Sequence, residues 1–115
     1  MTHFPKLIAF LAFLLPGAAL AQQWGAVGIG PGGAYGYAHD WNTERQAYGS
    51  AARGCEWDCT EIRTFFNTCA AMAVASNGGW GWGTGASRGA AESRAMGYCR
   101  QYGNGCRVRV WACSG

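Results

Sequence analysis

Cysteine is the residue type with the clearest chemistry in this 115-residue chain, which contains six of them. They are Cys55, Cys59, Cys69, Cys99, Cys106 and Cys113. An even number of cysteines in an exported chain predicts disulfides, and full pairing would leave no thiol nucleophile. The alternative is a zinc site built from Cys55-x3-Cys59 and Cys99-x6-Cys106. We do not favour zinc, because the second spacing is too wide for a usual zinc knuckle.

The other residues after position 21 that could do chemistry are one histidine and a few carboxylates. His39 stands beside Asp40, but a serine hydrolase would also need a serine on a strained turn, and we expect no serine in the G-x-S-x-G context of such a turn. A glycosidase needs two carboxylates that converge in one cleft. The remaining acids are scattered over expected helix starts, a loop and a strand: Glu44, Glu56, Asp58, Glu61 and Glu92. We therefore expect no catalytic residues and a surface or helix-entry role for His39.

One glycine pattern resembles a nucleotide-binding motif, but we do not interpret it as a cofactor site. Residues 28–33 spell Gly28-x-Gly30-x-x-Gly33, the formal dinucleotide fingerprint. That fingerprint requires a helix that begins at the glycines. Here Pro31 and a second expected strand follow, so we expect no nucleotide and no other cofactor.

Residues 1–21 have the pattern of a secretory signal peptide. Lys6 supplies a positive charge, an apolar run follows, and Ala19-Leu20-Ala21 is a small-x-small cleavage site. An uncleaved anchor is the alternative, but the apolar run is short for a membrane span. We predict cleavage after Ala21, no integral membrane span afterwards, and a periplasmic or secreted destination.

The remaining chain, residues 22–115, is 94 residues long, and we expect it to form one domain. Removal of the leader takes away the only lysine and leaves eight arginines against six acids, a net charge of +2. This charge is too small to indicate nucleic acid or an anionic membrane surface as a partner. A domain this small buries a limited core, so covalent crosslinks would add much to its stability.

The elements that would position these residues form two similar halves, about 22–68 and 69–115. We expect strands near 24–29, 34–38 and 60–66 with a helix at 44–54, then strands near 70–75, 79–83 and 106–112 with a helix at 88–100. Alanines and a cysteine recur on each helix at an offset of 44: Ala47, Ala51 and Cys55, then Ala91, Ala95 and Cys99. The fold class is therefore α+β, with tandem duplicated β-β-α-β units and pseudo-two-fold symmetry. The sheets of the two halves would either merge into one antiparallel sheet or face each other, covered by two helices and crosslinked by disulfides.

The repeat also predicts a disulfide pairing. In each half one cysteine ends the helix and one precedes the following strand, which gives Cys55–Cys59 and Cys99–Cys106. Cys69 and Cys113 would then pair and tie the centre of the chain to its end. A Cys55–Cys99 bridge between the two helix ends is the alternative.

The order of these segments resembles a known family. The segments are WGAVGIG, AYGYA, two alanine-striped helices that end in cysteine, NTCAAMAVA and GGWGWG. Together they resemble the family called domain of unknown function 4189, from about Trp24 to Cys113. The chain departs from that pattern at 60–66, where a valine-rich strand is more typical. The resemblance implies a small exported bacterial protein of α+β fold. It brings no established catalytic residues, and some members are thought to be secreted effectors.

The best candidates for partner binding are aromatic side chains on the two expected hairpins. Tyr35 and Tyr37 match Trp80 and Trp82, and all four rings would point away from the helices if the alternating glycines lie beneath them. Such rings could bind a protein or a sugar, or they could pack on each other as a second core. Arg107 and Arg109 beside Trp111 form a second candidate patch, which could also be a solvated strand face.

These observations favour an exported, non-catalytic binding protein of the bacterial envelope with a protein partner. An immunity or inhibitor protein that binds a toxin would fit this description. A secreted effector that acts outside the producing cell is the alternative, and an enzyme acting on cell-envelope glycan ranks third.

Overall fold

The computed structural model describes residues 22–115, so the predicted signal peptide lies outside the described residues. Strands and helices follow one another as β1 (Trp24–Ile29), the 3-10 turn η1 (Pro31–Gly33), β2 (Tyr35–Trp41), α2 (Glu44–Gly54), β3 (Glu61–Phe66), β4 (Cys69–Val74), β5 (Trp80–Gly85), α3 (Arg88–Cys99) and β6 (Arg107–Cys113). The predicted α+β class is confirmed. The largest departure is β2, which continues to Trp41 instead of ending near residue 38.

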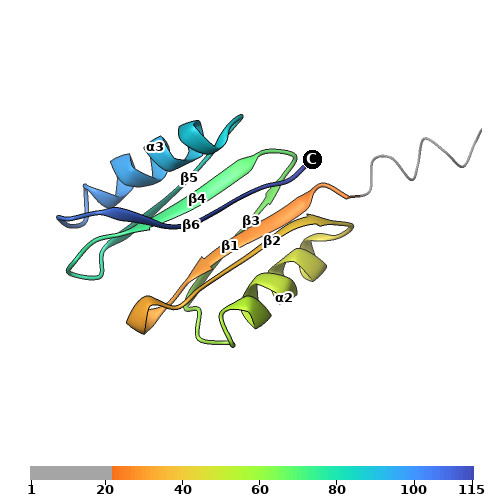
Figure 1. Ribbon diagram of the computed structural model, residues 1–115, viewed down its shortest axis with the longest axis horizontal. Helices are drawn as coiled ribbons and strands as arrows, with labels where there is room; N and C mark the ends of the chain where they lie inside the picture. Colours follow the sequence, from red (N-terminus) through yellow and green to blue (C-terminus); the bar gives the residue numbers. More distant parts are fainter. Residues whose placement is uncertain (1–21) are drawn as a thin grey trace, which may run out of the picture.

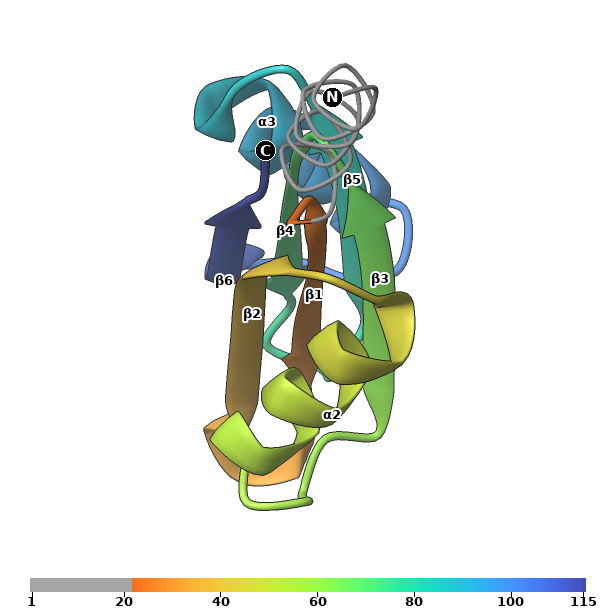
Figure 2. The same ribbon diagram turned by 90° about the vertical axis from the view of Figure 1, so that its right-hand side faces the viewer.

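The strands form two three-stranded antiparallel sheets, ordered β2-β1-β3 and β5-β4-β6. The sheets face each other, with α2 on the outer face of the first and α3 on the outer face of the second (Figures 1 and 2). The result is four layers, helix, sheet, sheet and helix. Strands β2 and β6 are edge strands on one side of this sandwich, and β3 and β5 are edge strands on the other (Figure 2).

Small residues let each helix lie directly on its sheet. A Cβ on Gly36 would lie 2.1 Å from the carbonyl oxygen of Ala51 in α2. A Cβ on Gly81 would lie 2.7 Å from the carbonyl oxygen of Ala95 in α3. Glycine is therefore required where each hairpin passes beneath its helix, as the alternating sequence indicated.

A hydroxyl side chain caps the start of each helix. Thr43 Oγ1 accepts a hydrogen bond of 3.1 Å from the backbone N–H of Gln46, and Ser87 Oγ accepts one of 3.1 Å from Ala90. Each bond satisfies one of the N–H groups that the first turn of a helix leaves unpaired.

The main hydrophobic core lies between the two sheets. It consists of Val27, Ile29, Phe65, Ala70, Met72, Val110 and Ala112. Two smaller, alanine-rich clusters lie between each sheet and its helix. Because those clusters contain few large side chains, the layer between the sheets holds most of the bulky apolar volume of the fold.

The expected alternation along the last strand is interrupted. Simple alternation would place Val108, Val110 and Ala112 on one face, but β6 contains a bulge at Arg109, between the pairs Ala73–Val108 and Met72–Val110. A bulge inserts one extra residue and shifts the alternation of side chains. Val108 therefore shares the helix-side face of Ala73, whereas Val110 and Ala112 face the other sheet.

Three disulfides crosslink the fold and use all six cysteines: Cys55–Cys59, Cys69–Cys113 and Cys99–Cys106. The alternative bridge between Cys55 and Cys99 is not formed. Disulfides persist in oxidising compartments, so the protein belongs in an extracellular or periplasmic environment. In the stretch from residue 22 to 115, no helix is long and apolar enough to cross a bilayer.

Candidate functional site

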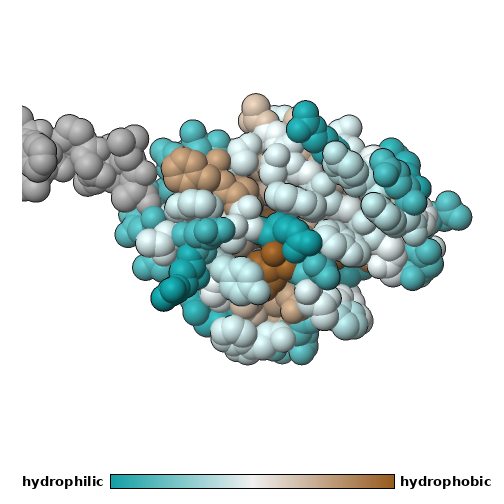
Figure 3. All heavy atoms as spheres, turned by 180° about the vertical axis from the view of Figure 1, so that it is seen from behind, coloured by the Kyte–Doolittle hydropathy of each residue, from teal (hydrophilic) through white to brown (hydrophobic). Residues whose placement is uncertain are grey.

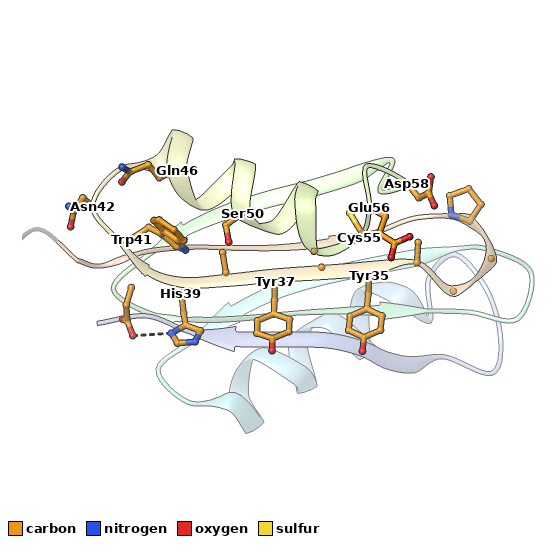
Figure 4. A pocket seen from close by; sticks show the side chains of 18 of the residues that line it. Tyr35, Tyr37, His39, Trp41, Asn42, Gln46, Ser50, Cys55, Glu56 and Asp58 are labelled. Atoms are coloured by element: carbon orange, nitrogen blue, oxygen red, sulfur yellow. Dashed lines mark hydrogen bonds and ion pairs between the residues drawn. The ribbon is translucent and has the colours of Figure 1, made fainter.

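An extensive groove runs along the free edge of β2. It has a volume of about 1090 Å³, and all seven residues of β2 line it, from Tyr35 to Trp41. Gln46, Ser50 and Gly54 of α2 form one wall, and the loop that carries Glu56 and Asp58 closes one end (Figure 4). Since β2 pairs only with β1, its other side has no neighbouring strand.

Tyr35, Tyr37 and His39 form a row on the side of β2 that faces away from α2 (Figure 4). Tyr35 pairs with Ile29 and Tyr37 with Val27, and directly paired residues share a face of an antiparallel sheet. The row therefore lies on the face toward the other sheet, but at its edge, where Tyr35 and Tyr37 remain 50% and 52% exposed. Rings on a rigid edge strand are suited to contact a partner.

The matching tryptophans lie elsewhere and in a different environment. Trp80 and Trp82 are half-buried and pack against the core between the sheets. They belong to β5, on the opposite side of the sandwich from β2 (Figure 2). The four hairpin rings therefore do not form one surface: the tyrosines are exposed, and the tryptophans contribute to the core.

A second groove of about 710 Å³ follows the edge of β5. Its charged lining residues are Arg63 and Arg94, and its aromatic ones are Trp80, Trp82, Tyr98 and Tyr102. The Arg63 guanidinium lies 5.1 Å from the centre of the Trp80 ring. From behind, where β3 and β5 lie, a small strongly hydrophobic spot is surrounded by hydrophilic and intermediate residues (Figure 3).

The expected patch of Arg107, Arg109 and Trp111 is divided by the β6 bulge. Trp111 pairs with Ala71 on the face toward α3, where the Arg88 guanidinium lies 4.1 Å from its ring centre. Arg109 lines a groove of about 610 Å³ between β2 and β6, together with Tyr35 and Tyr37. Arg107 is exposed and lines none of the grooves described here. One of the two arginines thus joins the tyrosine row.

His39 and Asp40 are held together with the end of the chain. His39 Nδ1 lies 3.0 Å from Asp40 Oδ2, and the Asp40 carboxylate also accepts a hydrogen bond from the Gly115 N–H. The hydrogen bond from His39, then that from Gly115, hold the pKa of Asp40 below its ordinary value. Ser114 Oγ accepts a hydrogen bond of 2.6 Å from the Asp40 backbone. These contacts anchor the C-terminus on β2.

A serine motif that the sequence interpretation overlooked lies between β5 and α3. Residues 85–89 spell Gly85-x-Ser87-x-Gly89, the pattern of a nucleophile elbow, and a strand and a helix flank it as that motif requires. The elbow needs strained backbone, whereas Ser87 is extended, with φ −140° and ψ 163°. Its hydroxyl caps α3. The expectation that no serine lies in a G-x-S-x-G context is therefore wrong, although the backbone of Ser87 is not the strained turn of an elbow.

The sequence predicted the Cys55–Cys59 bridge but not the backbone conformation of the loop that it closes. Glu56 and Trp57 have φ values of 53° and 64°, which non-glycine residues rarely adopt. Trp57 is 69% exposed, the most exposed of the large hydrophobic side chains. A tryptophan between two close cysteines was the only available signal, and it does not specify left-handed backbone.

A metal site does not emerge from this arrangement. Within residues 22–115, no three histidine, cysteine or acidic side chains lie close enough together to hold a metal ion.

Comparisons with known proteins place these features in a wider group. A family model described as "Domain of unknown function (DUF4189)" matches residues 24–113. Among solved structures, the chain is similar to the NMR structure of Rv1813c from Mycobacterium tuberculosis, with 32% sequence identity and a TM-score of 0.61. That similarity covers 79% of this chain and 74% of the other. No curated protein sequence matches the chain.

Proposed function

This chain belongs to the DUF4189 family, as its sequence indicated, and we propose that it is an exported binding protein whose partner is another protein. One observation carries the proposal: Tyr35 and Tyr37, each about half exposed, stand in a row on a free edge strand. Tyrosine is enriched where protein interfaces gain most of their binding energy. The row lies between two grooves, so a partner could contact both faces of β2.

The crosslinked scaffold supports binding better than catalysis. The Cys55–Cys59 bridge crosslinks the loop at one end of the groove, and a rigid interface loses less conformational entropy when a partner docks. The polar groups near the tyrosine row are committed to structure, since the Ser114 hydroxyl and the Asp40 carboxylate both accept backbone N–H groups. We therefore propose a non-catalytic role.

Export is part of this proposal. Residues 1–21 would act as a signal peptide cleaved after Ala21, and the partner would be met in the periplasm or outside the cell. A toxin neutralised by this protein is one partner of this kind, and a protein outside the producing cell is another. Intact mass measurement of the exported protein tests the cleavage site, because we expect the chain to begin at Gln22.

We also propose that residues 22–115 form one domain that arose by duplication of a β-β-α-β unit. The support is the shared strand order of the two sheets and the matching alanines and cysteine on α2 and α3. Superposition of 22–68 on 69–115 would test this origin, and we expect the strands and helices to coincide.

The binding proposal is tested by capture of the partner with the purified mature protein. The wild-type protein and the variant Tyr35→Ala/Tyr37→Ala are immobilised and exposed to extracts of the producing bacterium and of organisms that it meets. We expect the wild type to retain a specific protein that the double variant loses.

The matched control is Tyr48→Ala/Tyr98→Ala, because these tyrosines are about as exposed but lie on the helices. Equal retention by all three proteins would contradict binding through β2. Circular dichroism of each variant shows whether the fold is kept.

A further inference from the structure

We propose that the groove along β2 takes a basic, extended segment of the partner as an added strand. This inference rests on the proposed function and specifies the chemistry of the segment that is bound. The occupant is a stretch of about seven residues with a cation near each end, because β2 itself is seven residues long.

The geometry of β2 suits strand addition. An edge strand presents a row of N–H and C=O groups with no strand beside it, and an extended peptide can satisfy them. The groove follows the whole of β2. Its open side is accessible from Tyr35 to His39, and beyond them the Asp40 N–H is already bonded to Ser114 Oγ. On the α2 side the wall includes Ser50, which has a small side chain, and Gly54, which has none. These residues leave room for a second backbone.

The acidic side chains of the groove favour a basic partner segment. Its acidic lining residues are Asp40, Glu56 and Asp58, half of the six acids in the chain. Within the described part of the chain, none of the arginines lines this groove, although arginines outnumber acids. A local excess of one sign in a groove attracts the opposite charge. Arg109 lies in the neighbouring groove, between β2 and β6.

The acids stand at both ends of β2. Glu56 and Asp58 lie near Tyr35, and the aspartate bonded to His39 lies near the other end (Figure 4). A seven-residue strand spans roughly 20 Å. A partner strand with a cation near each end would therefore meet an acid at both ends and present alternating side chains to the two walls between them.

Trp57 does not line the groove itself, but it belongs to the loop at one end of it. It stands between Glu56 and Asp58 in the loop closed by Cys55–Cys59, and it is exposed. Its backbone has a positive φ, a strained conformation for a non-glycine residue that the surrounding structure must enforce. Strained residues of this kind cluster at binding sites. The side chain can pack on the apolar stem of an arginine or lysine.

A second copy of the chain is a less suitable occupant. The β5 groove is basic, with Arg63 and Arg94, so the β5 edge of one copy could approach the β2 edge of the next. Such a contact joins unlike surfaces and extends into a filament unless a ring closes. A separate partner strand meets the same charges and leaves the protein monomeric.

The test uses the mature protein and two capped synthetic peptides, RVTVTVR and its acidic counterpart EVTVTVE. Backbone amide shifts and hydrogen exchange are followed during titration. We expect the basic peptide to bind with shifts and slower exchange in β2, and the acidic peptide not to bind. Raising the ionic strength from about 0.01 M to 1 M shortens the screening length from about 30 Å to 3 Å and should weaken binding strongly.

Two isosteric double variants remove equal charge from different places. Glu56→Gln/Asp58→Asn should weaken the basic peptide about fivefold, and Glu61→Gln/Glu92→Gln should leave its affinity unchanged. Any of four results would overturn the inference. The two variants could weaken binding of the basic peptide equally, or the two peptides could bind wild type equally. The amide shifts could be confined to β5, or the protein could self-associate through β2. If the captured partner still needs Tyr35 and Tyr37, those results would leave the proposed function standing. If Tyr35→Ala/Tyr37→Ala retained the partner as well as wild type does, the proposed function itself would be contradicted.

Discussion

The backbone N–H of Asp40 donates a 2.6 Å hydrogen bond to the hydroxyl of Ser114, which lies 74 residues further along the chain. The Asp40 carboxylate accepts the Gly115 N–H, and the Ser114 N–H donates to the Thr68 carbonyl. The last residues are therefore held by β2 and by the link between the two sheets. This contact connects the proposed binding edge to the chain terminus.

The Asp40 contact should make stability depend on pH. A carboxyl whose folded-state pKa lies below its ordinary value of 3.8 stabilises the fold above that value, and this contribution is lost as pH falls through the lowered pKa. We expect the unfolding free energy of wild type to exceed that of Asp40→Asn at pH 7, with a difference that shrinks below about pH 4. Urea denaturation of both proteins measures it. A difference that stays constant down to pH 2 would exclude this role of the carboxylate.

The glycines beneath the helices should tolerate no side chain. Gly36→Ala would place a methyl group 2.1 Å from the Ala51 carbonyl oxygen, and we expect a loss of about 3 kcal/mol in unfolding free energy. Gly89→Ala is the control, because a Cβ there meets nothing within 4 Å and helix propensity improves by about 1 kcal/mol. If Gly36→Ala were as stable as wild type, the close packing of α2 on β2 would be wrong.

The disulfides should differ in their contribution according to the length of chain that they close. Cys69–Cys113 joins residues separated by 44 positions, and Cys99–Cys106 joins residues separated by 7. In the loop-entropy model, removing the first by double alanine substitution should cost about 4 kcal/mol and removing the second about 2.5 kcal/mol. Chemical denaturation ranks the two variants. The reverse order would show that native-state packing, and not loop closure, decides the cost.

The matched hairpin rings should respond differently to truncation. Trp82 packs against the core between the sheets, so Trp82→Ala should lower the unfolding free energy by about 3 kcal/mol. Tyr37 is 52% exposed, so Tyr37→Ala should cost less than about 1 kcal/mol. Thermal unfolding distinguishes these values. Equal losses would mean that Tyr37 is part of the core and unavailable to a partner.

Local patterns predicted most of the architecture because the signals were close together in the chain. The hydroxyls of Thr43 and Ser87 marked both helix starts, and alternating glycines marked the hairpin faces under α2 and α3. The number of strands and the antiparallel pairing followed from turn residues and alternation. These features depend on short-range geometry, which the sequence carries directly.

The features that sequence analysis missed depend on long-range packing. The bulge at Arg109 separates Trp111 from the arginines, and no residue type in Cys106–Cys113 signals it. Trp80 and Tyr35 occupy matching positions, yet Trp80 packs against the core between the sheets, whereas Tyr35 is half exposed. Whether a ring is core or surface was therefore beyond local inference.

The most direct test of binding through β2 is amide hydrogen exchange of the mature protein with and without its captured partner. We expect slower exchange of the amides in Tyr35–Trp41 in the complex, and unchanged exchange along β5. Protection confined to β5, with β2 unaffected, would contradict the assignment of the tyrosine-bearing edge as the binding surface.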